Sequence, residues 1–349
     1  MAQGVPEIGV GDLGAERFRA EIVPAARPVL MRGLLAAWPV VAAGRAGPAA
    51  LAAYLKPLDR GTRVTVKRPE QGRIFYRDDL TSFNFETEVM TVGAALDALA
   101  SGAADGHLAL QSVPLPAVMP GFTAANPMPL LPAAVAPRLW LGNAVTVAAH
   151  YDTDNNLAAV AAGRRRFTLF APDQVANLYP GPFELTSAKV IVSMVDFDAP
   201  DRERFPRFAE AEKAALVADL EPGDALFIPS MWWHHVRSLD PVNMLVNYWW
   251  KQAGAPQAAG MPALIHAMLA MRNLPDAERE AWRMLFDHFA FERDGAPGLH
   301  LPPERRGVQG ALSREAAREL RGRIADTLGP PRGPTLRERA KKLIRRFRG

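Results

Sequence analysis

The chain has 349 residues, of which 49% are hydrophobic and 8% aromatic, enough for a sizeable core in one large domain or two smaller ones. It contains no cysteine, which excludes disulfides, thiolate metal sites and a cysteine nucleophile, so any bound metal must be held by His, Asp or Glu. No apolar run is long enough to span a bilayer, and the N-terminus lacks a basic segment followed by an apolar one, so we expect a cytoplasmic protein.

The net charge of +4 hides an asymmetry along the chain. Residues 305–349 contain fourteen Lys and Arg against four acids, a net charge of +10, so the preceding 304 residues carry a net charge of −6. A basic end of this kind can lie near nucleic acid or an anionic membrane surface, or it can be a solvated helix without a partner.

The first 138 residues predict an arm followed by short strands and helices. Residues 1–30 form the arm, because they are rich in Gly, Pro and charge. Short apolar or alternating stretches predict strands, and Ala/Leu-rich stretches predict helices. We expect strands at 29–31, 63–66, 72–76 and 108–113, and helices at 46–55 and 92–100. The proline-rich residues 114–137 contain too many breakers for regular structure and should wrap the surface.

Residues 139–252 predict one short strand after another, separated by Gly, Pro and Asp. This spacing is typical of an all-β sandwich or barrel. Among the expected strands are 146–149, 157–160, 166–170, 225–228, 235–239 and 244–249. Residues 196–220 interrupt the pattern with a charged, partly helical insertion.

Residues 253–329 predict a helical segment, and residues 330–349 form a basic tail. Amphipathic helices are expected at 261–272, 276–291 and 313–328, with Asp276 as the N-cap of the second, and a basic amphipathic helix at 335–347. The apolar faces of the first two helices either pack on the barrel or form a homodimer interface.

A His-x-Asp unit, His150-Tyr151-Asp152, is the first part of a candidate metal site. In a strand, residues i and i+2 point the same way, so both side chains would enter one cavity. Such a pair also arises by chance, and alone it is a weak signal.

A second unit, Trp232-Trp233-His234-His235, strengthens the hypothesis of a metal site. Adjacent residues of a strand face opposite sides, and His234 shares its side with Val236 and Ser238, the less polar set, so His234 should point inward. It is then either a buried structural histidine or a third ligand. Two histidines and one carboxylate are the minimum set for an open-faced Fe(II) site, which Mn, Ni or Zn can also occupy.

Several further motifs, taken in order, carry a family resemblance. They are Arg32-Gly33, Trp38-Pro39, the His150–Asn156 run, the Gly163–Gln174 run, Val195–Asp198, Pro222-Gly223-Asp224, Ile228-Pro229, Val246–Trp249 and Met271-Arg272-Asn273. Together they resemble the JmjC/cupin-like Fe(II)/2-oxoglutarate-dependent oxygenases, in particular the asparaginyl hydroxylase of hypoxia-inducible factor and its bacterial cupin-like relatives. The similarity is dense over 139–252 and thinner elsewhere.

The resemblance implies a mainly β fold, a double-stranded β-helix or jelly roll with flanking helices and a C-terminal helical segment. Residues 1–138 would complete the barrel, 139–252 would form its core, and 253–329 would form the helical segment. Fe(II) would be held by His150, Asp152 and His234. The cosubstrate 2-oxoglutarate would place its distal carboxylate on Arg165, which in a strand faces away from Arg164 and Arg166. Thr146, Asn156 and Asn247 would help to hold the cosubstrate.

One residue departs from the resemblance. Ala109 stands where the asparaginyl hydroxylase has a tyrosine that contacts 2-oxoglutarate, so the pocket should be wider or bind its acid more loosely. Gln111 matches a substrate-contacting position.

Three functions follow as hypotheses. The first is hydroxylation of a protein or peptide side chain, and the second is the same chemistry on a small molecule or an RNA base. The third is a non-catalytic metal-binding cupin.

Overall fold

A computed structural model of the chain describes residues 3–11, 13–102, 106–186, 190–251 and 260–328. The chain divides into two compact units, Met1–Gln252 and Ala253–Gly349, which are described separately. Among the described residues, no helix combines the length and the apolar character needed to cross a bilayer.

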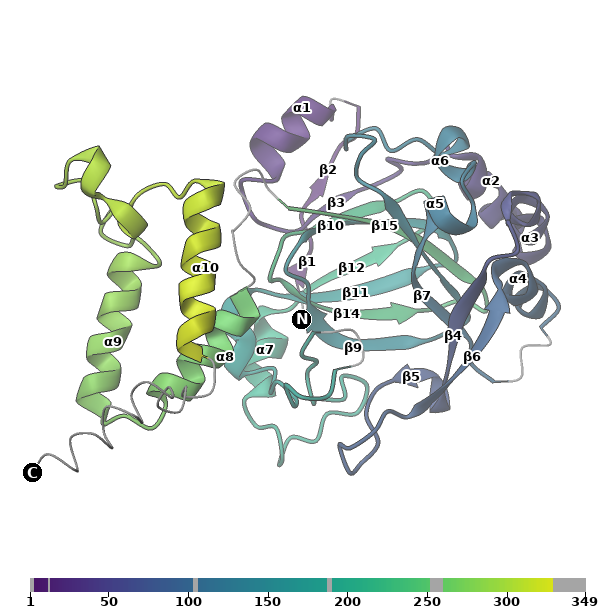
Figure 1. Ribbon diagram of the computed structural model, residues 1–349. Coiled ribbons are helices and arrows are strands. Elements are labelled where there is room, and N and C mark those ends of the chain that lie inside the picture. The colour runs from purple at the N-terminus through teal and green to yellow at the C-terminus, as the bar shows by residue number, and fades with distance from the viewer. Residues whose placement is uncertain (1–2, 12, 103–105, 187–189, 252–259, 329–349) are drawn as a thin grey trace, which may run out of the picture. The chain divides into compact units, whose positions relative to one another are not determined.

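The first unit is built on two β-sheets (Figure 1). One sheet has the strand order β1 (Gln3–Gly4), β12 (Leu216–Leu220), β11 (Arg165–Phe170), β14 (Trp233–Ser238), β9 (Thr146–Tyr151) and β5 (Arg73–Ile74). The other has the order β2 (Glu7–Ile8), β3 (Val29–Met31), β13 (Ala225–Ile228), β10 (Asn155–Ala162), β15 (Asn243–Trp250), β8 (Pro137–Gly142), β7 (Ala109–Pro114), β4 (Arg63–Pro69) and β6 (Phe85–Thr91). The central strands pair antiparallel with crossovers between neighbours, which confirms the expected jelly roll.

The core between the two sheets is formed by alternate side chains of facing strands. Phe167 and Leu169 of β11 pack there with Leu226, Ile228 and Leu245 from the other sheet. All eight residues of β10 are buried, because one face of this strand meets the barrel interior and the other meets helices. Replacing a buried Phe or Leu here by Ala should cost about 2–5 kcal/mol of unfolding free energy.

Helices cover the outer face of the larger sheet, where a second and larger core lies. They are α1 (Ala15–Arg17), η1 (Phe18–Ile22), α2 (Pro39–Ala46), α3 (Pro48–Leu55), η2 (Lys56–Leu58) and α4 (Val92–Ala100). Helix α4 begins where the Thr91 hydroxyl accepts a hydrogen bond from the Ala94 N–H, a standard N-cap. Helix α2 lies so close to β10 that a Cβ on Gly44 would be 2.2 Å from the Ala161 carbonyl oxygen.

Three segments of the first unit differ from the sequence predictions. The predicted N-terminal arm contains α1 and η1, and its residues Phe18 and Val23 are buried in the core. Residues 114–137 contain two short helices, α5 (Leu115–Val118) and α6 (Phe122–Ala125), with Phe122 fully buried. The insertion at 196–220 contains α7 (Phe208–Ala214), which confirms its expected helical part, and also strand β12, which the sequence did not predict. Strand β6 was likewise not predicted. In each segment, isolated apolar residues among prolines or charges form enough contacts to override the local breaker signals.

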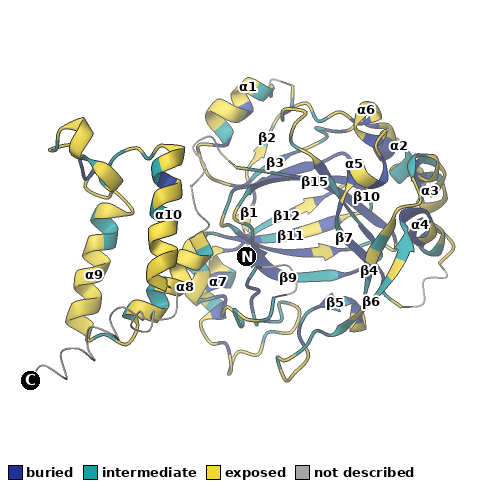
Figure 2. Ribbon diagram, in the orientation of Figure 1, coloured by how far each residue is buried: buried dark blue, intermediate teal, exposed yellow. Residues whose placement is uncertain are grey.

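The second unit contains α8 (Gly260–Met271), α9 (Asp276–Phe289), η5 (Pro303–Arg305), η6 (Gly307–Gln309) and α10 (Arg314–Leu328), close to the expected bounds. Asp276 is the first helical residue of α9 and pairs with Arg279, while the N-cap position belongs to Pro275, which corrects the expected cap. Most of α8 and α9 is coloured as exposed in Figure 2. Large apolar side chains of both helices are exposed, among them Leu269 and Trp282. The homodimer stays a prediction that these exposed faces support. The predicted tail helix at 335–347 lies outside the described residues.

Candidate metal centre and anion pocket

His150, Asp152 and His234 come together at one end of the barrel, where β9 and β14 lie side by side. His234 is directly opposite His150 in the strand register. One ligand atom from each of the three residues lies within 4.8 Å of the other two. Both histidines are buried, and His234 Nε2 is 3.6 Å from Asp152 Oδ2. Three donors at this spacing form one face of a site for a divalent ion.

The backbone orients both imidazoles. His150 Nδ1 lies 2.9 Å from the Ala148 carbonyl oxygen, and His234 Nδ1 lies 3.0 Å from the Trp232 carbonyl oxygen. A carbonyl can only accept, so each Nδ1 carries the proton and each Nε2 presents its lone pair to the cluster. Burial, and then the neighbouring His150, lower the pKa of His234 to about 4. At neutral pH the His234 imidazole is therefore in the neutral form that metal binding needs.

The next histidine in the chain has a different environment. His235 points to the outer side of the sheet, where its ring stacks on Phe197 with centroids 4.7 Å apart. Burial lowers the pKa of His235 to about 3, with a further contribution from Arg73 and Arg237. The expected inward orientation of His234 and outward orientation of His235 is confirmed.

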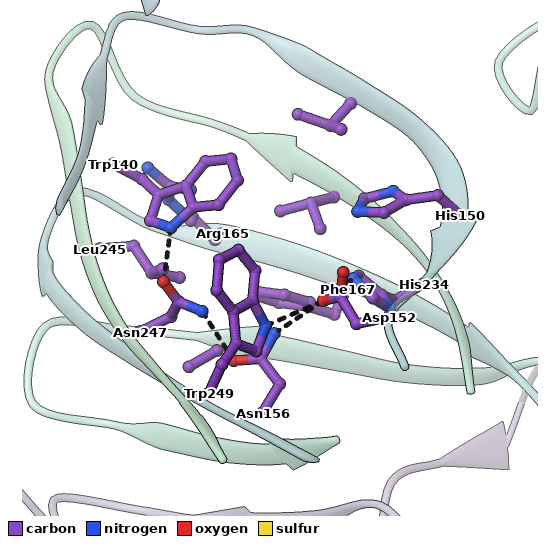
Figure 3. A pocket seen from close by; sticks show the side chains of 13 residues that line it. Trp140, His150, Asp152, Asn156, Arg165, Phe167, His234, Leu245, Asn247 and Trp249 are labelled. Carbon is purple, nitrogen blue, oxygen red and sulfur yellow. Dashed lines mark hydrogen bonds and ion pairs between the residues drawn. The ribbon is translucent and has the colours of Figure 1, made fainter. Parts of the chain in front are cut away.

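The metal cluster opens into a cavity formed by strands of both sheets. Its walls are mostly apolar and aromatic, with a few polar groups (Figure 3). The lining residues are Trp140, Val147, His150, Asp152, Asn156, Ala158, Arg165, Phe167, His234, Val236, Leu245, Asn247 and Trp249.

Arg165 is the cation of this cavity. Its neighbours Arg164 and Arg166 point outward and pair with Asp240 and Asp219, whereas Arg165 is 7% exposed. Its Nε atom is buried without a hydrogen-bond partner, and burial lowers the pKa of Arg165 to about 10. A buried guanidinium without a counter-charge among the described residues is costly unless an anion joins it. The cavity therefore suits a ligand with a carboxylate at the end away from the metal.

A hydrogen-bond network joins the metal cluster to the rest of the cavity (Figure 3). The Trp249 indole donates to Asp152 Oδ2 at 3.0 Å, and Asn156 Nδ2 lies 3.4 Å from the same oxygen. Asn247 donates to Asn156 Oδ1, and Trp140 donates to Asn247 Oδ1. These contacts fix the carboxylate of Asp152, and fixing a ligand in this way raises metal affinity.

The structure brings Asn156, Asn247 and Arg165 to the cavity, as expected, but it does not bring Thr146 there. Strand β9 has an irregular register between its pairings with His234 and Val236, consistent with a bulge at residues 148–149. Val147 consequently lines the cavity, while Thr146 pairs with the exposed Arg237. Thr146 is absent from the cavity because of this local bulge, which the sequence does not signal.

Ala109 and Gln111 line a second cavity that adjoins the first. The two cavities share Arg165, Trp140, Val147 and Val236. Ala109 therefore lies in a cavity that reaches Arg165, and the wider pocket stays a prediction.

Sequence reasoning missed Trp249 and Trp140. Strand alternation from Asn247 would have placed Trp249 on the cavity side of β15. The hydrogen bond from Trp249 to Asp152, however, depends on how the strands close around the cavity. The fit of the site can be judged from these residues. Neutral imidazoles and a carboxylate suit a divalent metal, and Arg165 suits a carboxylate ligand that reaches the metal at its other end.

Comparisons with known proteins agree with the geometry. Residues 15–255 match the sequence model of the cupin-like domain family. The chain is 38% identical over 115 residues to HSPB1-associated protein 1 of Homo sapiens, which covers 32% of this chain and 22% of that protein. It is 38% identical over 112 residues to lysine-specific demethylase 8 of Xenopus tropicalis, with coverage of 32% and 24%.

A third relative is tRNA wybutosine-synthesizing protein 5 of Danio rerio, 37% identical over 102 residues, with coverage of 29% and 28%. The chain thus spans about a quarter of the length of these curated relatives. The family match covers more than half of the chain, and it coincides with a jelly roll that holds a His–Asp–His cluster. The chain belongs to the cupin-like (JmjC) domain family.

Proposed function

We propose that the protein is an Fe(II)- and 2-oxoglutarate-dependent dioxygenase that hydroxylates a protein or peptide side chain. The observation that carries this proposal is the buried Arg165, which has no partner at its Nε and shares a cavity with the His150, Asp152 and His234 cluster. A dicarboxylate that binds a metal at one end and a guanidinium at the other fits both features. Relatives named as a lysine-specific demethylase and a tRNA wybutosine-synthesizing protein support a modifying enzyme.

In the proposed mechanism, His150, Asp152 and His234 hold the iron and leave its other face open. Arg165 binds the distal carboxylate of 2-oxoglutarate and thereby sets which end of the acid faces the metal. When bound, iron and 2-oxoglutarate would supply, with dioxygen, the oxidation of a substrate C–H to an alcohol: one oxygen atom would enter the alcohol and the other the succinate that forms from 2-oxoglutarate with loss of carbon dioxide.

The remaining residues keep the site dry and fixed. Phe167, Val236 and Leu245 form the apolar walls beside Arg165, so water is excluded and the charge interaction with the dianion is strengthened. Trp249 and Asn156 hold Asp152 in place through the same carboxylate oxygen. No side-chain general base is required for this chemistry, and the geometry nominates none.

A second candidate is the same chemistry on a small molecule or an RNA base. The similarity to a protein named for tRNA wybutosine synthesis favours it, and the basic C-terminal residues would suit RNA. The third hypothesis, a metal-binding cupin without turnover, predicts metal binding but no conversion of 2-oxoglutarate.

An anaerobic titration with Fe(II) and 2-oxoglutarate tests the proposal. We expect a weak visible charge-transfer band in the native protein, because 2-oxoglutarate chelates the iron. His234→Ala should abolish the band and weaken metal binding more than 100-fold, whereas His235→Phe, which preserves an aromatic ring against Phe197, should keep the band. Metal binding without the band would contradict the 2-oxoglutarate site, and a band without succinate formation in air would favour the non-catalytic cupin.

A further inference from the structure

A second cation, Arg138, lies against Trp249, one of the residues that line the metal cavity. Arg138 of β8 is directly opposite Asn247 of β15, so it projects from the same face as the cavity-lining Asn247 and Trp140. Its guanidinium carbon is 5.7 Å from the ring centroid of Trp249, which donates to the metal-ligand candidate Asp152. A single indole therefore separates Arg138 from the metal cluster.

The protein holds this guanidinium in a defined position. Arg138 Nε donates to Ser112 Oγ, and Nη2 donates to the Ser112 carbonyl oxygen, both at 2.6 Å. Ser112 has a φ of +55° and lies in the register irregularity of β7 between Leu110 and Val113. A left-handed backbone is unfavourable for a serine, and such residues concentrate at functional sites. The bulge thus presents two acceptors to one side of Arg138 and leaves Nη1 free to point elsewhere.

No described carboxylate neutralises Arg138. Burial lowers the pKa of Arg138, and no nearby charge raises it. Two other half-buried arginines differ, since Arg68 of β4 pairs with Glu88 and Arg73 of β5 pairs with Asp196. Arg138 is also half-buried, so it is partly desolvated, but it has no such ion pair among the described residues.

Once the metal and 2-oxoglutarate are bound, the charges of the site cancel without Arg138, so the positive charge of Arg138 is left over. The two positive charges of the metal and the charge of Arg165 balance Asp152 and the 2-oxoglutarate dianion. An anion that pairs with Arg138 must therefore come from the substrate. The first 304 residues carry a net charge of −6, which opposes a polyphosphate chain but not a single carboxylate.

We propose that Arg138 binds a carboxylate of the prime substrate, and that the substrate is an acidic peptide or a small acid whose oxidised carbon lies on the metal side of Trp249. This inference rests on the proposed function and adds the substrate class to it. Arg138 would act as the specificity-determining cation, with Ser112 as the residue that positions it.

Binding near the metal can be measured without turnover. The protein is loaded with Mn(II) and 2-oxoglutarate, with Mn(II) occupancy checked by electron paramagnetic resonance. Mn(II) broadens the proton resonances of a probe bound beside it. The probes are pooled nonapeptides with a central aspartate, the matched pool with asparagine, N-acetylaspartate, N-acetylasparagine and a short oligouridylate. The peptides and the N-acetyl acids distinguish the two sources of carboxylate.

We expect acidic probes to bind about tenfold more tightly than their amide counterparts. Arg138→Glu should remove this preference, and Arg138→Lys should keep part of it because the charge remains. The control is Arg166→Glu, which makes the same change of charge on the outer face of β11 and should leave the preference intact.

Three outcomes would overturn the inference alone, and a fourth would overturn the proposed function as well. Equal binding of acid and amide probes, with Mn(II) and 2-oxoglutarate retained, removes it while the proposed function stands. An equal loss in Arg166→Glu would reduce the effect to overall charge, and preferential broadening of the oligouridylate would point to nucleic acid. Failure to retain Mn(II) and 2-oxoglutarate would instead overturn the proposed function, and this inference with it.

Discussion

The inner and outer faces of the sheet that contains β11 and β14 carry the same kinds of side chain in different environments. On the outer face, Arg164 and Arg166 pair with Asp240 and Asp219. On the inner face, Arg165 is buried, and the described residues supply it with no counter-charge. The two solvent-facing arginines are therefore paired with carboxylates, whereas the arginine that faces the cavity has none beside it in the described part of the chain. An uncompensated charge inside a cavity is therefore a stronger sign of a ligand than a charged surface.

The histidines of β14 show the same contrast. His234 faces Asp152 across 3.6 Å, whereas His235 stacks on Phe197. Burial lowers the pKa of both, so the pKa values alone would not tell them apart. What distinguishes His234 is the carboxylate and the second histidine within ligand distance.

The largest expected effect sharpens the comparison of the arginines. Arg165→Gln should weaken 2-oxoglutarate binding about 100-fold, because a charge-assisted contact in a dry cavity is lost. The same change should raise the unfolding free energy of the ligand-free protein by on the order of 1 kcal/mol, because a buried charge without a partner is removed. Calorimetric titration and denaturant unfolding would measure the two effects.

Arg166→Gln is the matched control on the outer face. It breaks an exposed pair with Asp219, so the binding free energy of 2-oxoglutarate and the unfolding free energy should each change by less than about 1 kcal/mol. Similar losses of 2-oxoglutarate affinity in both variants would remove the special role of Arg165. A loss of stability in ligand-free Arg165→Gln would show that the guanidinium is compensated within the chain.

A smaller effect, on the pH dependence of the unfolding free energy, is expected at Lys67. It extends the comparison of buried and exposed cations to strand β4. Lys67 pairs in register with Ala109, so it faces the cavity side, and its ammonium lies 4.5 Å from the Phe85 ring centroid. Burial lowers its pKa from 10.5 to about 8. Below pH 8, both the folded and the unfolded chain keep the proton, so this group makes no pH-dependent contribution to stability there. Between pH 8 and 10.5 the folded chain releases the proton first, and the wild-type protein gains stability as the pH rises.

Lys67→Met should consequently be more stable than the wild type by roughly 2 kcal/mol at pH 7, with a difference that shrinks towards pH 10.5. Urea unfolding at several pH values measures this. Lys56→Met, at an exposed lysine paired with Asp97, should show no such trend. A constant difference across the pH range would mean that the effect comes from packing and not from the buried charge.

Much of this contrast could be predicted from the sequence. The bounds of β3, β13 and α4 agree with apolar runs of strand or helix length, because burial and local propensity favour the same structure there. Strand alternation correctly predicted that His234 points inward. For the three consecutive arginines it predicted only that Arg165 faces away from its neighbours, and the family resemblance singled out Arg165 as the inward one. The same rule failed at Thr146, because a bulge in β9 adds a residue to the repeat.

Contacts between distant strands could not be predicted from one sequence. The indole of Trp249 reaches Asp152 across 97 positions of the chain, and Arg138 reaches Ser112 across a bulge at which serine adopts an unusual backbone. Such contacts depend on strand register, which no single stretch of sequence encodes. The segment 114–137 shows the converse, since its prolines predicted irregular structure while Phe122 and Leu115 anchored short helices.

The smallest expected effect concerns Ala109, in the second cavity that reaches Arg165. Ala109→Tyr should fill the space beside Arg165 and bring a hydroxyl near the distal carboxylate. We expect 2-oxoglutarate to bind about three- to tenfold more tightly, in line with one added hydrogen bond, and the longer 2-oxoadipate to bind less tightly. Ala109→Phe separates the two causes, because it fills the same space without the hydroxyl and should weaken 2-oxoadipate alone. If both variants lose 2-oxoglutarate and 2-oxoadipate equally, the added ring blocks Arg165 itself, and the space at Ala109 belongs to the cosubstrate site rather than lying behind it.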